Sequence, residues 1–133
     1  MRFLVVFLVS ALLPGMAIAQ SYKANEFYET CRDTASSQLL CIGYMKGVVD
    51  GVRGHVTYKY LMARGPLPIN SKEEAASHLV EMQRQFPFCP PKSGTIELYK
   101  DIVVTKLERS PELRDLSAAY VIIDTLSKTF PCN

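Results

Sequence analysis

The chain has 133 residues, of which 15 are basic and 13 acidic, so its formal net charge at pH 7 is +2. This near balance, with no cluster of Lys and Arg, argues against nucleic acid as a partner and against electrostatic anchoring to a membrane. The length suits one domain with a modest hydrophobic core.

The N-terminus has the pattern of an export signal. An early basic residue precedes the almost wholly apolar stretch Phe3–Leu13, and Ala17 and Ala19 are the small residues that a signal peptidase recognises. The apolar stretch is too short to span a bilayer as a stable helix, and no later stretch is long enough. We expect cleavage after Ala19, so that residues 1–19 are a signal peptide and residues 20–133 form one domain without a membrane span, in an oxidising compartment.

The apolar spacing in the first half of this domain predicts helices. Asn25 can cap a short first helix, and a longer helix is expected to begin near Gln38 and to run to about Met62, before the stop at Gly65–Pro66. Apolar residues at intervals of four predict the buried stripe of the longer helix. That stripe comprises Leu40, Tyr44, Val48 and Val52.

Three further helices are expected in the second half. Ser71 and Glu74 fit a capping box that opens a helix reaching about Gln85. Thr95 can cap the next helix, and Ser110–Pro111 can begin the last one, so that these two helices form an antiparallel hairpin. The expected buried residues of the three helices are Ala75, His78, Leu79 and Met82, then Ile96, Tyr99, Val103 and Leu107, then Leu113, Leu116, Tyr120, Ile123 and Leu126. The sequence therefore predicts an all-α fold, a small disulfide-linked bundle of about four to five helices.

Four cysteines in an exported chain indicate disulfides. Four cysteines allow three connectivities, which spacing alone does not resolve. Cys31 and Cys41 flank the turn between the first two helices. In an antiparallel hairpin, Cys132 returns beside the start of the preceding helix, where Cys89 lies. We therefore expect the pairs Cys31–Cys41 and Cys89–Cys132.

Zinc is the competing interpretation of the cysteines, because His55 and His78 are further possible ligands. No two cysteines are two to four residues apart, and neither histidine has a neighbour at ligand spacing, so we expect no metal and no other cofactor. No nucleophile or metalloprotease motif is present either. We therefore expect a binding protein and not an enzyme.

Gly43, Gly47 and Gly51 recur at every fourth position and share one face of the long helix. Each glycine costs a helix about 1 kcal/mol relative to alanine, so three on one face need compensation. Close approach of another backbone provides it. The expected partner is another helix of the same chain or a second copy of the chain in a homodimer.

Aromatic and apolar residues gather at the end of the long helix and in the connector that follows it. Such residues are enriched at protein interfaces, and the alternative is that they cover the core. We expect a protein partner to contact this segment. The candidate residues are Tyr58, Tyr60, Leu61, Met62, Leu67 and Ile69.

The order of several short motifs resembles a known family. The motifs are Cys41-x-Gly43-Tyr44-x-x-Gly47-x-x-Asp50, Phe88-Cys89-x-Pro91, Ser110-Pro111-Glu112, Ala118-Ala119 and Phe130-Pro131-Cys132. This pattern is similar to that of the Tai, or Rap/Tai, immunity proteins, which are paired with amidase effectors of type VI secretion. The likeness covers residues 25–54 and 88–132, whereas a middle segment of about residues 56–86 departs from the pattern.

The resemblance implies a small, helical, exported protein with disulfides. It further implies a homodimer that binds a peptidoglycan-cleaving amidase in the periplasm and blocks its active-site cleft. The alternative is a periplasmic acid-stress chaperone of similar helical, disulfide-linked build. Acid-induced binding of a hydrophobic dye would distinguish the chaperone.

Overall fold

A computed structural model describes residues 21–33, 37–65, 67 and 70–132. The expected signal peptide and its cleavage site lie outside these residues. The helices in chain order are α1 (Ala24–Arg32), α2 (Gln38–Arg64), α3 (Lys72–Gln83), α4 (Ile96–Arg109), the 3-10 helix η1 (Pro111–Asp115) and α5 (Ala118–Thr129). The predicted all-α fold class is confirmed, and none of the helices described is long and apolar enough to cross a membrane.

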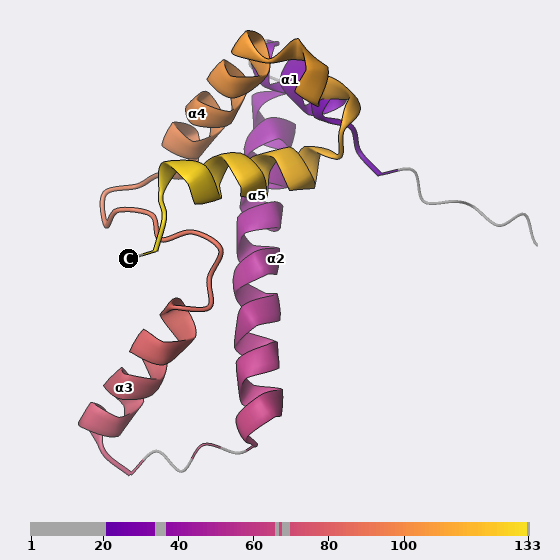
Figure 1. Ribbon diagram of the computed structural model, residues 1–133. Coiled ribbons are helices and arrows are strands. Elements are labelled where there is room, and N and C mark those ends of the chain that lie inside the picture. Colours follow the sequence, from indigo (N-terminus) through magenta and orange to yellow (C-terminus); the bar gives the residue numbers. More distant parts are fainter. Residues whose placement is uncertain (1–20, 34–36, 66, 68–69, 133) are drawn as a thin grey trace, which may run out of the picture.

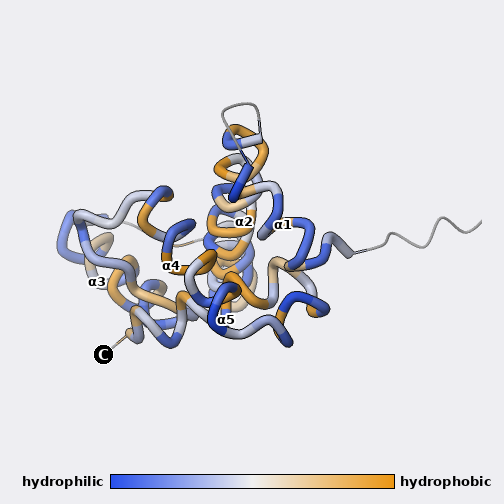
Figure 2. The backbone as a smooth tube through the Cα atoms, turned by 90° about the horizontal axis from the view of Figure 1, so that it is seen from above, coloured by the Kyte–Doolittle hydropathy of each residue, from blue (hydrophilic) through white to orange (hydrophobic). Residues whose placement is uncertain are grey.

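The core lies where α1, α4, α5 and the first half of α2 meet (Figure 1). In the view from above, α2 is seen close to end-on with the other helices around it (Figure 2). The largest fully buried side chains come from all four of these helices, and include Phe27, Met45, Leu107, Ile122 and Leu126. Burial of such side chains supplies most of the driving force for folding.

Helix α2 has 27 residues and is therefore about 40 Å long. Its second half extends beyond the core, and α3 folds back beside it to form a projecting arm (Figure 1). We define the arm as residues 56–64 of α2 together with α3. Helix α3 has no fully buried residue, so the arm is a two-helix projection with little core of its own.

The predicted buried stripe of α2 is displaced by one position. The buried residues are Cys41, Met45, Val49 and Tyr60, whereas Leu40 is 70% exposed. The disulfide from Cys41 to Cys31 of α1 explains this rotation, because it turns the Cys41 face of α2 toward the body. Spacing alone did not distinguish two adjacent stripes that are both apolar.

The predicted last helix is divided in two. Pro111 begins η1 as expected, but α5 begins only at Ala118. Two backbone hydrogen bonds hold the chain between them: Ala24 N–H donates to the Leu116 carbonyl over 2.9 Å, and Ala118 N–H donates to the Tyr22 carbonyl over 2.9 Å. Leu116 and Tyr120 are consequently exposed. The buried residues of α5 are instead Ala118, Val121, Ile122, Thr125 and Leu126.

Some of the predicted side-chain caps are present and one is not. Ser71 Oγ accepts from Glu74 N–H over 3.1 Å and Thr95 Oγ1 accepts from Leu98 N–H over 3.2 Å, so these two side-chain caps are confirmed. The return bond of the predicted capping box differs, because Glu74 Oε2 accepts from Asn70 N–H over 3.0 Å. Asn25 does not cap α1, which begins one residue earlier, at Ala24, without a side-chain cap. The backbone pairing of Ala24 with Leu116 takes the place of that cap.

Candidate partner-binding surface

The arm carries apolar side chains that nothing in the described part of the chain covers. On α2, Tyr58 is 61% exposed, Leu61 43% and Met62 67%. On α3, Leu79 and Val80 are each about half exposed. The arm therefore presents apolar surface on both of its helices, which is typical of sites where a protein partner docks.

Tyr60 does not belong to this surface, which corrects the sequence-based expectation. It is 3% exposed. Its hydroxyl lies 2.9 Å from His78 Nδ1 and donates to Glu81 Oε2 over 3.3 Å, while Arg64 pairs with Glu81. The guanidinium of Arg64 also lies 5.0 Å from the centroid of the Tyr60 ring. Tyr60 therefore joins α2 to α3 and holds the arm together.

Burial raises the pKa of the Tyr60 phenol above its usual value. The positive charge of Arg64 opposes the shift, and the negative charge of Glu81 adds to it. A phenol is protonated near neutral pH in any case, and the raised pKa extends this to higher pH. It can then donate to Glu81, so the joint between the two helices is intact at physiological pH.

The connector between α2 and α3 contributes less to the exposed apolar surface than the sequence predicted. Leu67 is half-buried, and Ile69 lies outside the described residues. The sequence also placed Leu79 on the buried side of α3, whereas it is exposed, and Val80 was not predicted at all. The narrow apolar stripe of α3, flanked by charged residues, was the available signal that this helix packs only lightly.

The glycine face of α2 is open. Among the residues described, a Cβ atom built on Gly43, Gly47 or Gly51 would meet nothing within 4 Å, and the same holds for Gly54. The expectation that another helix of this chain packs against these glycines is therefore wrong. A contact with a second copy stays a prediction, because only one chain is described.

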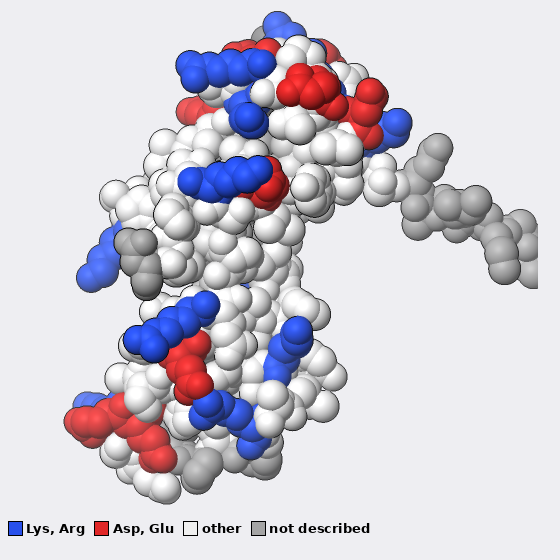
Figure 3. Space-filling view, viewed as in Figure 1, with Lys and Arg blue, Asp and Glu red and all other residues white. Residues whose placement is uncertain are grey.

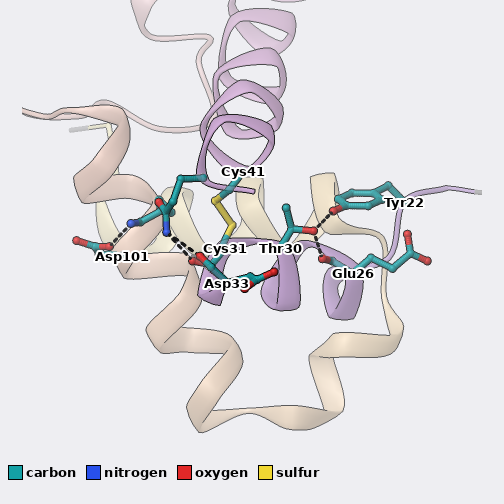
Figure 4. Close-up of a disulfide and its surroundings, with 9 residues drawn as sticks. Tyr22, Glu26, Thr30, Cys31, Asp33, Cys41 and Asp101 are labelled. Carbon is teal, nitrogen blue, oxygen red and sulfur yellow. Dashed lines mark hydrogen bonds and ion pairs between the residues drawn. A yellow bond between two sulfur atoms is a disulfide. The ribbon is translucent and has the colours of Figure 1, made fainter. Parts of the chain in front are cut away.

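Both predicted disulfides are confirmed. Cys31 and Cys41 are joined with a Cα–Cα distance of 5.1 Å, and Cys89 and Cys132 with 4.9 Å. The first bond lies at the turn from α1 into α2 (Figure 4). Gln38 Nε2 closes the same turn by donating to the Cys31 carbonyl over 3.3 Å. This end of α2 is thus fixed to α1 both covalently and by hydrogen bonding.

A short network braces α1 beside this disulfide. Thr30 Oγ1 donates to the Glu26 carbonyl over 2.7 Å, and the hydroxyl of Tyr22 lies 2.9 Å from Thr30 Oγ1 (Figure 4). Because the Thr30 proton is used, Tyr22 is the donor of the second bond. The network connects the segment before α1 to the helix and stabilises the body away from the arm.

The second disulfide fixes the base of the arm. Cys89 lies in the connector between α3 and α4, and Cys132 follows α5. Cys89 N–H also donates to the Phe130 carbonyl over 2.8 Å, and the Phe130 ring meets the Tyr99 ring at 5.8 Å. The end of α5 therefore returns to the start of α4, as the predicted pairing required.

The residues described do not form a recognisable metal site. No group of three or more His, Cys, Asp and Glu side chains among them is placed to hold a metal ion. His78 Nδ1 lies within hydrogen-bond distance of the Tyr60 hydroxyl in the arm, and His55 lies exposed on α2.

The charged side chains are mixed over the face shown in Figure 3. Lys46 pairs with Asp50 at 2.6 Å and Lys128 with Asp124 at 2.8 Å, each one helical turn apart. The hydrogen bond to Asp124 raises the pKa of Lys128. Exposed pairs of this kind contribute little to stability, because solvent screens them.

The sequence of this chain matches one known protein family over most of its length. The sequence model of the Rap1a immunity proteins matches residues 23–132, which include the arm as well as both ends of the domain. Neither the curated proteins nor the solved structures include a significant match.

Proposed function

The chain belongs to the Rap1a family of immunity proteins, and we propose that it binds and inhibits a peptidoglycan amidase toxin of a type VI secretion system in the periplasm. The match over residues 23–132 carries this proposal. Membership of an immunity-protein family implies a protein toxin as the partner. The amidase, the secretion system and the compartment are the further steps that we propose.

Blocking an active-site cleft needs a projecting element and no chemistry in the inhibitor. The arm has the required shape, because it extends from a body that is fixed by two disulfides. Its exposed apolar residues, above all Tyr58 and Met62, can lose their contact with water on docking. Since the body is already ordered by its cross-links, little entropy is lost when the arm docks. We propose that the arm enters the toxin.

A periplasmic location accounts for the cysteines and for the N-terminus together. Disulfides form and persist in oxidising compartments such as the bacterial periplasm. The N-terminal pattern of the sequence supplies a route there, with cleavage after Ala19. An inhibitor in this compartment would meet the toxin where peptidoglycan, the proposed substrate of the toxin, lies.

We propose that the glycine face of α2 forms a homodimer. The open space beside Gly43, Gly47 and Gly51 allows a second backbone to approach closely. Substitution Gly47→Ala distinguishes the dimer from an unused face. In a monomer the added methyl group meets nothing and stabilises α2 by about 1 kcal/mol, whereas in a close-packed dimer it weakens association. Light scattering that gives a monomer at every concentration would refute the dimer.

Affinity capture tests the toxin-binding function. Tagged, oxidised protein comprising residues 20–133 is incubated with a lysate of the source organism, and the bound proteins are identified by mass spectrometry. The proposal expects a peptidoglycan amidase in stoichiometric amount. The double substitution Tyr58→Asp with Met62→Asp should abolish its recovery, and the matched control Leu116→Asp with Tyr120→Asp, at exposed apolar sites on the body, should not. Recovery of many unfolded proteins in acid, and no amidase, would favour the chaperone.

A further inference from the structure

A cleft of about 380 Å³ lies at the base of the arm. Val52 and Arg53 of α2 form part of its lining, and the connector from α3 to α4 supplies Phe86–Pro90 and Lys92. The volume is at the lower end of the range for ligand pockets, about 300–1,000 Å³. It is large enough for a side chain or two of a bound segment and too small for a folded element.

The connector wall of the cleft is fixed before any ligand arrives. Phe88 is 4% exposed and anchors the connector in the core. Pro87 and Pro90 restrict its backbone, and the bond from Cys89 to Cys132 ties it to the end of α5. Preorganisation of this kind lowers the entropy lost on binding. The apolar Phe and Pro faces favour an aromatic or branched apolar side chain.

The charge at the rim has one sign. Arg53 and Lys92 are exposed, and none of the lining residues that the structure describes is acidic. Among the residues described, neither cation has an ion-pair partner within 4 Å. By contrast, the hollow between α1 and the start of α2 is lined by Glu29, Arg32 and Asp33, which carry both signs. The rim of the cleft therefore complements an anionic group.

We propose that this cleft binds a short protein segment in which an apolar side chain stands next to carboxylates. The apolar side chain lies against the Phe and Pro wall, and the carboxylates meet Arg53 and Lys92. As part of the toxin, this segment would contact the inhibitor beside the arm, and in that respect the inference rests on the proposed function. It adds a second contact, polar and sequence-selective, to the apolar contact of the arm.

The probe is the peptide acetyl-Glu-Phe-Glu-amide, with acetyl-Lys-Phe-Lys-amide as the matched control. Each is titrated into the isotope-labelled, oxidised protein comprising residues 20–133, and amide shifts are followed by NMR. The acidic peptide is expected to cause saturable shifts at Val52, Gln83 and Phe88, whereas the basic peptide causes none there. Arg53→Glu should weaken binding about fivefold, the effect of one exposed ion pair, and the control Arg109→Glu should leave it unchanged.

Two results would overturn the inference: no saturable shift at the cleft with the acidic peptide, or equal binding of the basic peptide. The spectrum of Arg53→Glu also reports whether that variant is folded. The titration requires no toxin, so it separates the two proposals. Capture of an amidase without peptide binding would contradict only the proposal that the cleft binds an acidic segment. Peptide binding without any captured toxin would support the cleft proposal and contradict the proposal that the protein binds a toxin.

Discussion

Removal of the disulfide between Cys89 and Cys132 should destabilise the domain more than removal of the disulfide between Cys31 and Cys41. The bond from Cys89 to Cys132 joins residues 43 positions apart, and the bond from Cys31 to Cys41 joins residues 10 positions apart. In the chain-entropy treatment, a cross-link stabilises the fold by restricting the unfolded chain, and its effect grows with the logarithm of the loop length. The longer loop corresponds to about 4 kcal/mol and the shorter to about 2.7 kcal/mol.

The expected difference, about 1.3 kcal/mol, is measurable against the total stability of a small domain, about 5–15 kcal/mol. The paired substitutions Cys89→Ala with Cys132→Ala and Cys31→Ala with Cys41→Ala are compared by urea unfolding, followed by circular dichroism. The slope of the transition must stay unchanged for the free energies to be comparable. If both variants lost the same free energy of unfolding, or if removal of the Cys31–Cys41 bond cost more, restriction of the unfolded chain would not determine which disulfide stabilises the domain more.

Three further substitutions test the packing. Leu107→Ala should lower the free energy of unfolding by about 2–5 kcal/mol in a urea melt, because the side chain is fully buried. Thr125→Val should raise the melting temperature, with a gain of about 1 kcal/mol, because Thr125 Oγ1 is buried without a hydrogen-bond partner among the residues described; a lower melting temperature would contradict this. Tyr60→Phe should cost about 1 kcal/mol and speed amide exchange in α3 selectively. Because folding raises the pKa of Tyr60, the folded state keeps the proton that the unfolded chain loses, so stability falls as the pH rises above about 10. Urea melts at pH 9 and 11 should show a smaller fall for Tyr60→Phe than for the wild type.

Local signals in the sequence were sufficient to place α2, α3 and α4. Ser71 and Thr95 cap their helices because a short polar side chain reaches the free amides of the first turn whatever lies elsewhere in the fold. The pairing of Cys89 with Cys132 followed from the return of the last helix. The Tai-like motifs likewise indicated the immunity-protein class that the family match supports.

Features that depend on tertiary contacts were not predictable from spacing. Leu40 and Cys41 both lie on apolar stripes, and the stripe that carries Cys41 is buried because it packs in the core shared with α1, α4 and α5. The break before Ala118 results from backbone hydrogen bonds to Tyr22 and Ala24, which no local pattern records. The candidate site shows the same limit.

Tyr58 and Met62 lie on the surface, but Tyr60 lies between the arm helices because α3 folds back onto it. Its aromatic character alone does not separate an interface residue from one that joins two helices. The glycine face shows the opposite case, in which a pattern typical of close packing lies open to solvent within this chain.

Inhibition of the captured amidase is the most direct test of the central claim. Hydrolysis of purified peptidoglycan is measured while oxidised protein comprising residues 20–133 is added in increasing amounts. The account predicts complete inhibition near one chain per toxin, and loss of inhibition by at least about a hundredfold for Tyr58→Asp with Met62→Asp, as for removal of interface hot spots. Undiminished hydrolysis with the wild-type protein, or full inhibition by the arm variant, would contradict it.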